Sequence, residues 1–376
     1  VLAFINILYS SYFDYFLSIN SYIATLIVSL LFGFILIFIG KNSEKKINFI
    51  EQLILIIFVY LLIAALISLP FYLSNYQVTF LNAFFESVSG ITGTGFSIFE
   101  NIKYLDPTLI LWRSSSQWIG GLYFLFFLLL IFSNKKFNYK MNELTYSGDI
   151  RINSEANIKN SLIKIFILYS ILSFTIFLFL NVSEVRMFNS LNLSMSLVSA
   201  GGFIPTNSLD KIINSNFQKL VFIFALLVSM LNFFLIFNIL RKNTILRKHQ
   251  EDLYIIVLSL ILILLIYFNE YSGLNITISI LSSLSNSGLS LINSDNNLHL
   301  YFILVTAIGG SFISNSSGIK FTRIYILLKT VSSEIIKLVS PNNVINKNIF
   351  STENKITEEN IKISFLIFIS FFISLF

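Results

Sequence analysis

The feature that most constrains this sequence is a short run of glycine and threonine between two apolar segments. The run is SGITGTGFS, residues 89–97. The segment before it, residues 82–88, is too short to cross a bilayer, whereas the segment after it, residues 111–132, is long enough. Irregular backbone at membrane depth is tolerated only where protein buries it or where it lines a water-filled path. The pattern therefore predicts a re-entrant pore loop, whose carbonyls could replace the water shell of a cation.

The composition of the chain is that of a membrane protein. Of its 376 residues, 55% are hydrophobic and only 12% are charged, and the mean hydropathy is +0.80. A soluble domain has about twice that charged fraction. We therefore expect an all-α polytopic membrane protein. The absence of cysteine excludes disulfides, and the presence of only two histidines argues against a histidine-based zinc site.

The net charge of +6 has a topological explanation. Most lysine and arginine residues gather between the predicted spans, in residues 41–46, 135–164, 241–248 and 320–362. By the positive-inside rule these loops are cytoplasmic. The charge therefore predicts no nucleic-acid partner. It predicts a multi-pass protein of the cell inner (cytoplasmic) membrane with a cytoplasmic N-terminus.

The plan of span, short helix, glycine-containing run and span recurs twice more. The second short helix is MFNSLNLSMSLV, residues 187–198, and its run is SAGGF, residues 199–203. The third is residues 276–284, and its run is SNSGL, residues 285–289. Regular spacing of this kind is typical of internal repeats. We expect pseudo-fourfold repeats of helix, pore loop and helix around a central ion pore.

The repeats divide the chain into six predicted segments. Because the chain begins inside an apolar run and stops within a span, we expect it to be a fragment whose fourth repeat is truncated. The segments are peripheral N-terminal helices (1–40), a first pore-loop unit (49–133), a second (159–241), a third with a broken second helix (251–329), a cytoplasmic segment (330–362) and the first helix of an incomplete fourth unit (363–376).

The returning helix of the third unit is interrupted by small and polar residues. The interruption reads IGGSFISNSSGIKFTR, residues 308–323. One interpretation is a kinked helix that packs closely through its small residues. The other is a flexible segment that obstructs the pore until it moves. Lys320 follows the interruption, and we expect its side chain to reach the inner surface of the membrane.

Three charged residues near the first run have alternative interpretations. Glu86 lies in the short helix, and an acid at membrane depth is a functional candidate. We favour a structural role in which Glu86 braces the pore loop through hydrogen bonds. Arg113 and Asp106 could pair at the outer mouth, but we expect solvent to surround them.

These motifs together resemble a known family. The sequences FLNAFFESVSGITGTGF with WRSSSQWIGG, MFNSLNLSMSLVSAGGF, and IGGSFISNSSGIKFTRIYILLK are similar to the membrane subunit of Trk-type potassium uptake systems (TrkH-like), in the Trk/Ktr/HKT superfamily. The resemblance implies filter strands centred on Gly95, Gly202 and Gly288. The implied potassium-binding filter residues are Thr92, Gly93, Thr94, Gly95, Ser199, Ala200, Gly201, Gly202, Ser285, Asn286, Ser287 and Gly288. The implied gating-loop residues are Gly309, Gly310, Ser314, Asn315, Gly318 and Lys320.

The resemblance also implies the chemistry and the partners. Potassium would be the transported and bound ion, and no organic cofactor is expected. Family members form homodimers in the lipid bilayer and bind a cytosolic regulatory ring that senses nucleotides.

Two other classes of protein fit the sequence less well. A sodium-coupled or proton-coupled cation or solute symporter with broken helices would have inverted repeats, whereas these repeats run parallel. A membrane enzyme would need a nucleophile and a base within the spans, and the predicted spans hold no such cluster, so we expect no enzyme. The residues leave open whether the ion passes through a channel or by coupled symport.

Overall fold

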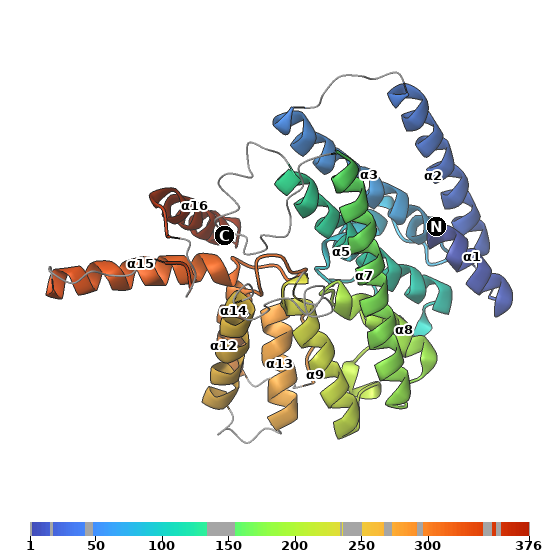
Figure 1. The fold of residues 1–376 in the computed structure, drawn as a ribbon. Coiled ribbons are helices and arrows are strands. Elements are labelled where there is room, and N and C mark those ends of the chain that lie inside the picture. The colour runs from blue at the N-terminus through green and yellow to red at the C-terminus, as the bar shows by residue number, and fades with distance from the viewer. Residues whose placement is uncertain are drawn as a thin grey trace. The chain divides into compact units, whose positions relative to one another are not determined.

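The computed structural model describes residues 2–15, 18–41, 48–133, 155–233, 235, 250–266, 273–291, 296–340, 348–350 and 355–375. Within these ranges the regular elements are helices (Figure 1). They are α1 (Leu2–Tyr12), α2 (Ile19–Gly40), α3 (Phe49–Tyr72), α4 (Phe80–Thr92), η1 (Ile102–Tyr104), α5 (Pro107–Ser133), α7 (Glu155–Val182), α8 (Met187–Val198), η2 (Leu209–Lys211), α9 (Asn216–Met230), α12 (Gln250–Ile266), α13 (Gly273–Ser285), α14 (Asn296–Ile308), α15 (Phe321–Val339) and α16 (Glu358–Leu375).

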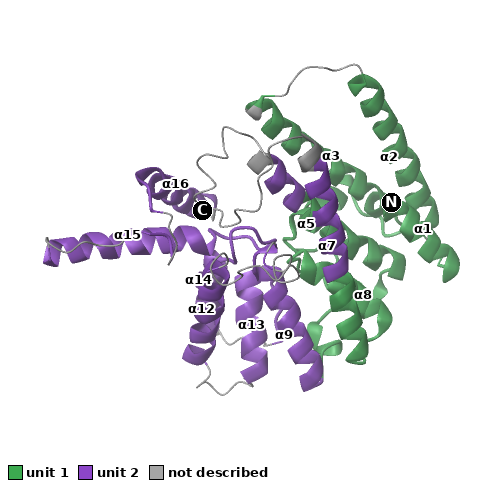
Figure 2. Ribbon diagram, viewed as in Figure 1, with its two compact units in different colours: residues 1–123, 173–214 green, residues 124–172, 215–376 purple. Residues whose placement is uncertain are grey.

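The chain forms two compact units, which Figure 2 shows in different colours. Unit 1 comprises residues 1–123 and 173–214, and unit 2 comprises residues 124–172 and 215–376. Helices α5 and α7 contribute residues to both units. The first two predicted runs therefore belong to unit 1, whereas the third run and the interruption of the returning helix belong to unit 2.

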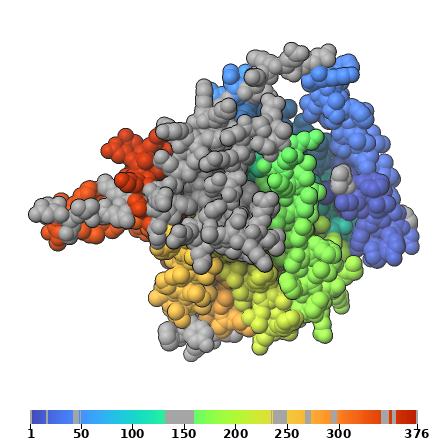
Figure 3. Space-filling model, viewed as in Figure 1, coloured from blue at the N-terminus to red at the C-terminus, as the bar shows by residue number. Residues whose placement is uncertain are grey.

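Three of the described helices are long and apolar enough to cross a membrane. They cover Ile19–Gly40, Ile50–Tyr72 and Lys159–Val182. Helix α2 leaves most of its apolar side chains uncovered, and its blue atoms are visible along one edge in Figure 3. Phe34 and Phe38, for example, are 68% and 83% exposed. Uncovered apolar side chains on a helix of this length are what a lipid-facing span requires.

In unit 1 the short helix α4 packs against the span α3. The hydroxyl of Tyr60 on α3 donates to the Ile91 carbonyl near the end of α4, at 2.9 Å. The indole Nε1 of Trp112 on α5 donates to the Ile67 carbonyl of α3, at 3.0 Å. Buried apolar side chains such as Phe71 fill the space between these helices. The run after α4 is therefore held on a scaffold of two longer helices.

In unit 2 the short helix α13 packs against α9, α12 and α14. Helix α14 ends at Ile308 and α15 begins at Phe321, so residues 309–320 interrupt the returning helix. This confirms the interruption predicted from the small residues. Helix α15 continues to Val339 and packs against α16.

The three short helices occur where the sequence predicted them. Helix α8 has the predicted bounds, and α4 and α13 are each a few residues longer than predicted. A polar side chain helps to begin α4, because the Thr79 hydroxyl accepts from the backbone N–H of Asn82. Each helix is followed within two residues by a residue with left-handed backbone, as described next.

Candidate functional site

The first run leaves α4 through two glycines in the left-handed region. The φ angles are +71° at Gly93 and +81° at Gly95. The N–H of Gly93 donates to the Gly90 carbonyl at 3.0 Å. The hydroxyls of Thr92 and Thr94 lie 2.6 Å apart and are exposed. A left-handed bend of this kind turns the backbone sharply away from the helix axis.

The second run leaves α8 in the same way without a glycine at the bend. Ala200 has a φ of +55°, and its N–H donates to the Leu197 carbonyl at 3.0 Å. The N–H of Gly201 donates to the Ser196 carbonyl at 2.8 Å. The Ser199 hydroxyl bonds carbonyls of its own helix, Met195 at 3.0 Å and Ser196 at 2.9 Å.

The third run repeats the geometry of the second. Asn286 has a φ of +59°, and Gly288 has a φ of +68°. The N–H of Asn286 donates to the Ser283 carbonyl at 3.2 Å, and that of Ser287 donates to the Ser282 carbonyl at 3.0 Å. Gly93, Ala200 and Asn286 therefore occupy equivalent positions, each bonded to the carbonyl three residues before it. Gly95, Gly202 and Gly288 follow two residues later. Gly95 and Gly288 have positive φ angles, whereas Gly202 does not.

Within unit 1 the first two runs touch. A methyl group added to Gly95 would lie 2.7 Å from the Gly202 Cα atom and 3.0 Å from the Gly202 nitrogen. One added to Gly93 would lie 3.7 Å from the Ser199 carbonyl oxygen. The structure therefore brings these two predicted runs together through their backbones.

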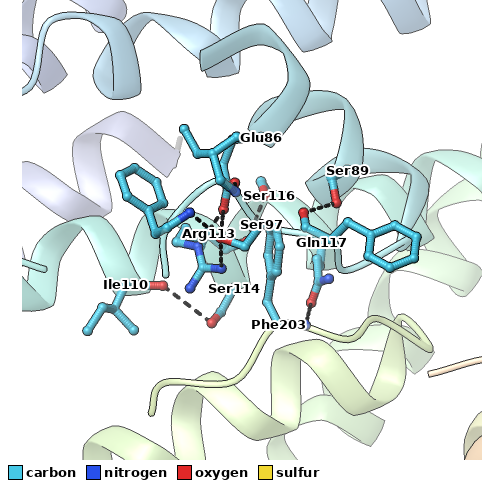
Figure 4. A network of polar contacts seen from close by, with 12 residues as sticks. Glu86, Ser89, Ser97, Ile110, Arg113, Ser114, Ser116, Gln117 and Phe203 are labelled. Atoms are coloured by element: carbon cyan, nitrogen blue, oxygen red, sulfur yellow. Dashed lines mark hydrogen bonds and ion pairs between the residues drawn. The ribbon is translucent and has the colours of Figure 1, made fainter. Parts of the chain in front are cut away.

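A buried ion pair braces the first run (Figure 4). Arg113 Nε donates to Glu86 Oε1 at 2.7 Å. The other oxygen of Glu86 accepts from the Ile98 N–H at 2.9 Å, and the Ser97 hydroxyl donates to Oε1 at 3.1 Å. This confirms the bracing role predicted for Glu86. The expectation that solvent surrounds Arg113 and Asp106 is wrong, because they are 1% and 5% exposed. Arg113 pairs with Glu86 rather than with Asp106.

Helix α5 reaches the second run as well. The Arg113 guanidinium lies over the Phe203 ring, 4.2 Å from its centroid. One turn further along α5, Gln117 Oε1 accepts from the Phe203 N–H at 3.2 Å and from the Ser196 hydroxyl at 2.8 Å. Figure 4 shows Arg113 and Gln117 on the same side of α5. Gln117 was not predicted as a site residue, although its position four residues after Arg113 places both on one helix face.

In unit 2 the interruption of the returning helix folds onto the ends of α9 and α12. The N–H of Ser311 donates to the Met230 carbonyl at 2.9 Å, and the N–H of Phe233 donates to the Ile313 carbonyl at 2.9 Å. The carboxylate of Glu251, in the first turn of α12, accepts from the Phe312 N–H at 2.9 Å and from the Thr322 hydroxyl. Glu251 was also missed, and the only signal was an acid opening an apolar helix.

The glycines at the two ends of the interruption lie against each other. Gly309 and Gly318 have φ angles of +70° and +88°, and a methyl group on Gly318 would lie 3.0 Å from the Gly309 Cα atom. A methyl group on Gly310 would lie 2.5 Å from the Met230 carbonyl oxygen. Close backbone approach explains the small residues here.

Lys320 turns back into the interruption. Its ammonium donates to the Ser314 carbonyl and hydroxyl, each at 3.2 Å, and to the Ser316 carbonyl and hydroxyl. The side chain is 7% exposed. The prediction that it reaches the membrane surface is therefore wrong, because four oxygens inside the fold satisfy the charge.

The third run is linked directly to the interruption. The side-chain nitrogen of Asn286 donates to the Ser317 hydroxyl at 2.7 Å. Two predicted site segments of unit 2, residues 285–288 and residues 309–320, are therefore in contact. A displacement of either segment would therefore strain or break the hydrogen bond between Asn286 and Ser317.

Comparison with known proteins identifies the family and the fold. The sequence model of the TrkH family, described as cation transport protein, matches residues 18–257, more than half of the chain. The chain belongs to the TrkH family. Its fold is that of a TrkH membrane protein, because it superposes on the crystal structure of the potassium transporter TrkH from Vibrio parahaemolyticus with a TM-score of 0.80. That likeness covers 98% of this chain and 80% of the other, at 20% identity.

Relatives with curated descriptions are named as cation or potassium transport proteins. An uncharacterized cation transporter from Methanocaldococcus jannaschii is 26% identical over 322 residues, which cover 84% of this chain and 66% of the relative. The Trk system potassium uptake protein TrkG from Escherichia coli is 24% identical over 330 residues, which cover 82% of this chain and 67% of the relative. The chain thus spans about two thirds of the length of these TrkH-family relatives.

Proposed function

We propose that this TrkH-family chain carries potassium across the cytoplasmic membrane. The observation that carries the proposal is the shared backbone geometry of the three runs, with left-handed residues at Gly93, Ala200 and Asn286. Backbone carbonyls suit potassium because they are partly negative and have no proton to titrate. Three runs of one geometry, in a family described as cation transport proteins, are a repeated filter element.

In this proposal the filter is lined by the twelve residues of the three runs. Each short helix directs its partly negative C-terminal end toward the run that follows it, which favours a cation. The contact between Gly95 and Gly202 supports the pairing of the first two runs. The third run is assigned by the sequence repeat and by its matching hydrogen bonds.

The interruption at residues 309–320 is proposed as the gate. Its support is the conformation that the segment adopts, with left-handed glycines at both ends and hydrogen bonds to neighbouring helices. The bond between Asn286 and Ser317 would couple the gate to the third run.

The proposed assembly follows the relatives and the charge pattern. We propose a homodimer with a cytosolic nucleotide-binding ring and an N-terminus on the cytoplasmic side. The relatives named as parts of a Trk system support a regulatory partner. Light scattering of the purified protein tests the dimer.

Potassium-limited growth tests the function. We expect the chain to rescue a cell that lacks its own potassium uptake. We expect Gly202→Asp to abolish rescue, because it adds a charged side chain at the point where the first two runs touch. The matched control is Asn101→Asp, at an exposed position whose side-chain oxygen accepts from Asn207 and can still do so as a carboxylate. Equal growth of the Gly202→Asp and wild-type cells would overturn the proposal.

Rubidium uptake into proteoliposomes separates the two modes of transport. Uptake that needs neither a sodium nor a proton gradient supports a gated channel. Uptake that stops when both gradients are removed supports the coupled symporter instead.

A further inference from the structure

The three short helices share a serine at one position. Ser89, Ser196 and Ser282 each lie four residues before the left-handed residue that ends their helix. Each hydroxyl bonds an oxygen of the run that follows, namely the Phe96 carbonyl at 2.5 Å, the Gly201 carbonyl at 3.0 Å and the Ser287 hydroxyl at 3.1 Å. The repeat therefore places one serine hydroxyl behind each run. It donates to a backbone carbonyl in the first two repeats, whereas in the third either Ser282 or Ser287 can be the donor.

In the second repeat two acceptors compete for the proton of this hydroxyl. Ser196 Oγ lies 3.0 Å from the Gly201 carbonyl oxygen and 2.8 Å from Gln117 Oε1. A serine hydroxyl has a single proton to donate, so a strong bond to one acceptor weakens the other. Ser196 and Gln117 are both fully buried, which leaves no bulk water to take the place of either acceptor.

The side chain of Gln117 has a determined orientation. Its oxygen must face the second run because it accepts from the Phe203 N–H at 3.2 Å. Its nitrogen Nε2 is buried without a hydrogen-bond partner, an arrangement that costs free energy. A methyl group on Gly201 would collide with the Gln117 amide. The Gln117 amide therefore contacts Gly201 closely and leaves its own Nε2 without a partner. This arrangement is consistent with a role of Gln117 in setting the conformation or charge of the second run.

We propose that Gln117 is a positioning residue that sets how tightly the second run holds a monovalent cation, by drawing the Ser196 proton away from the Gly201 carbonyl. The inference rests on the proposed function, in which that carbonyl is a ligand. When the Ser196 hydroxyl donates to the Gly201 carbonyl, its partly positive hydrogen lies beside the carbonyl oxygen and weakens the attraction of that oxygen for a cation. When Gln117 accepts the proton, the carbonyl oxygen is free to bind the ion.

Two substitutions have opposite expected effects. Gln117→Leu removes the competing acceptor, so the proton stays on Gly201 and the apparent affinity for potassium falls by about threefold to tenfold, as expected for one net hydrogen bond. Ser196→Ala removes the proton and leaves the affinity at or above that of the wild type. A purely structural role would make both changes lower it.

The double variant separates this mechanism from damage to the fold. Gln117→Leu also removes the acceptor of the Phe203 N–H, and the double variant still lacks that acceptor. We expect the double variant to have the same affinity for potassium as Ser196→Ala, because it has no Ser196 hydroxyl to donate to the Gly201 carbonyl. The matched control is Ser194→Ala on the same helix, whose hydroxyl bonds only the Leu191 carbonyl among the contacts described.

The experiment measures the KM and kcat of rubidium uptake and the potassium-dependent rise in melting temperature of the purified protein. The expected result is a raised KM for Gln117→Leu with kcat little changed, reversed in the double variant. Equal losses for Gln117→Leu, Ser196→Ala and the double variant would overturn the inference. Absence of potassium-dependent uptake by the wild type would instead overturn the proposed function.

Discussion

Arg113 and Glu86, on α5 and α4, form an ion pair with 2.7 Å between Nε and Oε1. The two side chains are 1% and 0% exposed. The same carboxylate accepts from the backbone of Ile98, so one buried pair connects a short helix, the chain after its run and the returning helix. Buried charges of this kind stabilise an arrangement only while both partners are present.

Removing one partner of this pair is expected to lower the stability of the fold strongly. Glu86→Met leaves the Arg113 charge buried and unpaired, and we expect a loss of about 3–5 kcal/mol in the free energy of unfolding. The matched control is Glu334→Met, which breaks the exposed pair with Lys337, whose two side chains are 39% and 63% exposed. Such a pair is worth about 0–1 kcal/mol. Thermal unfolding in detergent compares the two variants, and similar melting temperatures for both would contradict this account.

Gly95→Ala tests the contact between the first two runs. Alanine at a φ of +81° costs about 1–2 kcal/mol, and its methyl group would lie 2.7 Å from the Gly202 Cα atom. We expect cation uptake to be lost because the two backbones must separate. Gly33→Ala in α2 is the control, since a methyl group there meets nothing within 4 Å and the helix gains about 0.5–1 kcal/mol. Normal rubidium uptake by Gly95→Ala would refute the contact.

The elements of this fold could be predicted because a bilayer restricts the choices. A helix either has the length to span or does not, and that rule alone separates α8, with 12 residues, from α7, with 28. The interruption after Ile308 was also predictable, since three glycines and four serines cannot maintain an apolar helix face.

The polar contacts could not be predicted in the same way. Arg113 pairs with Glu86, 27 residues earlier in the chain, and nothing local in the sequence reveals that partner. Lys320 was expected at the membrane surface because long side chains at helix ends usually extend there. Its backbone φ of +78° turns it back toward Ser314 and Ser316 instead.

Phe350 is expected to hold the segment after α15 against the helix. Its ring centroid lies 4.4 Å from that of Tyr325 and 5.2 Å from that of Tyr254, and the side chain is 3% exposed. Phe350→Ala should cost about 3–5 kcal/mol locally, as for other buried aromatic rings. Faster amide hydrogen exchange in α15 near Tyr325 is the expected signal. Phe365→Ala, at a 54% exposed position on α16, is the control, and equal exchange in both variants would count against the prediction.

Lys320→Met is expected to loosen the proposed gate. The substitution keeps an unbranched side chain but removes the bonds to Ser314 and Ser316, which hold the interruption in its present conformation. A hydrogen bond to a charged group contributes about 1.5–3 kcal/mol, so losing even one would raise the population of a rearranged conformation by about tenfold or more. If that conformation conducts, the initial rate of rubidium uptake into proteoliposomes rises while the melting temperature falls.

The control for this change is Lys211→Met, which removes an equal charge from an exposed position in η2. We expect it to alter neither quantity, because solvent surrounds that side chain. A fall in both uptake and stability for Lys320→Met would mean that the lysine supports the conducting conformation. The bonds of the Lys320 ammonium would then stabilise a conformation of the interruption that conducts, rather than one that blocks the pore.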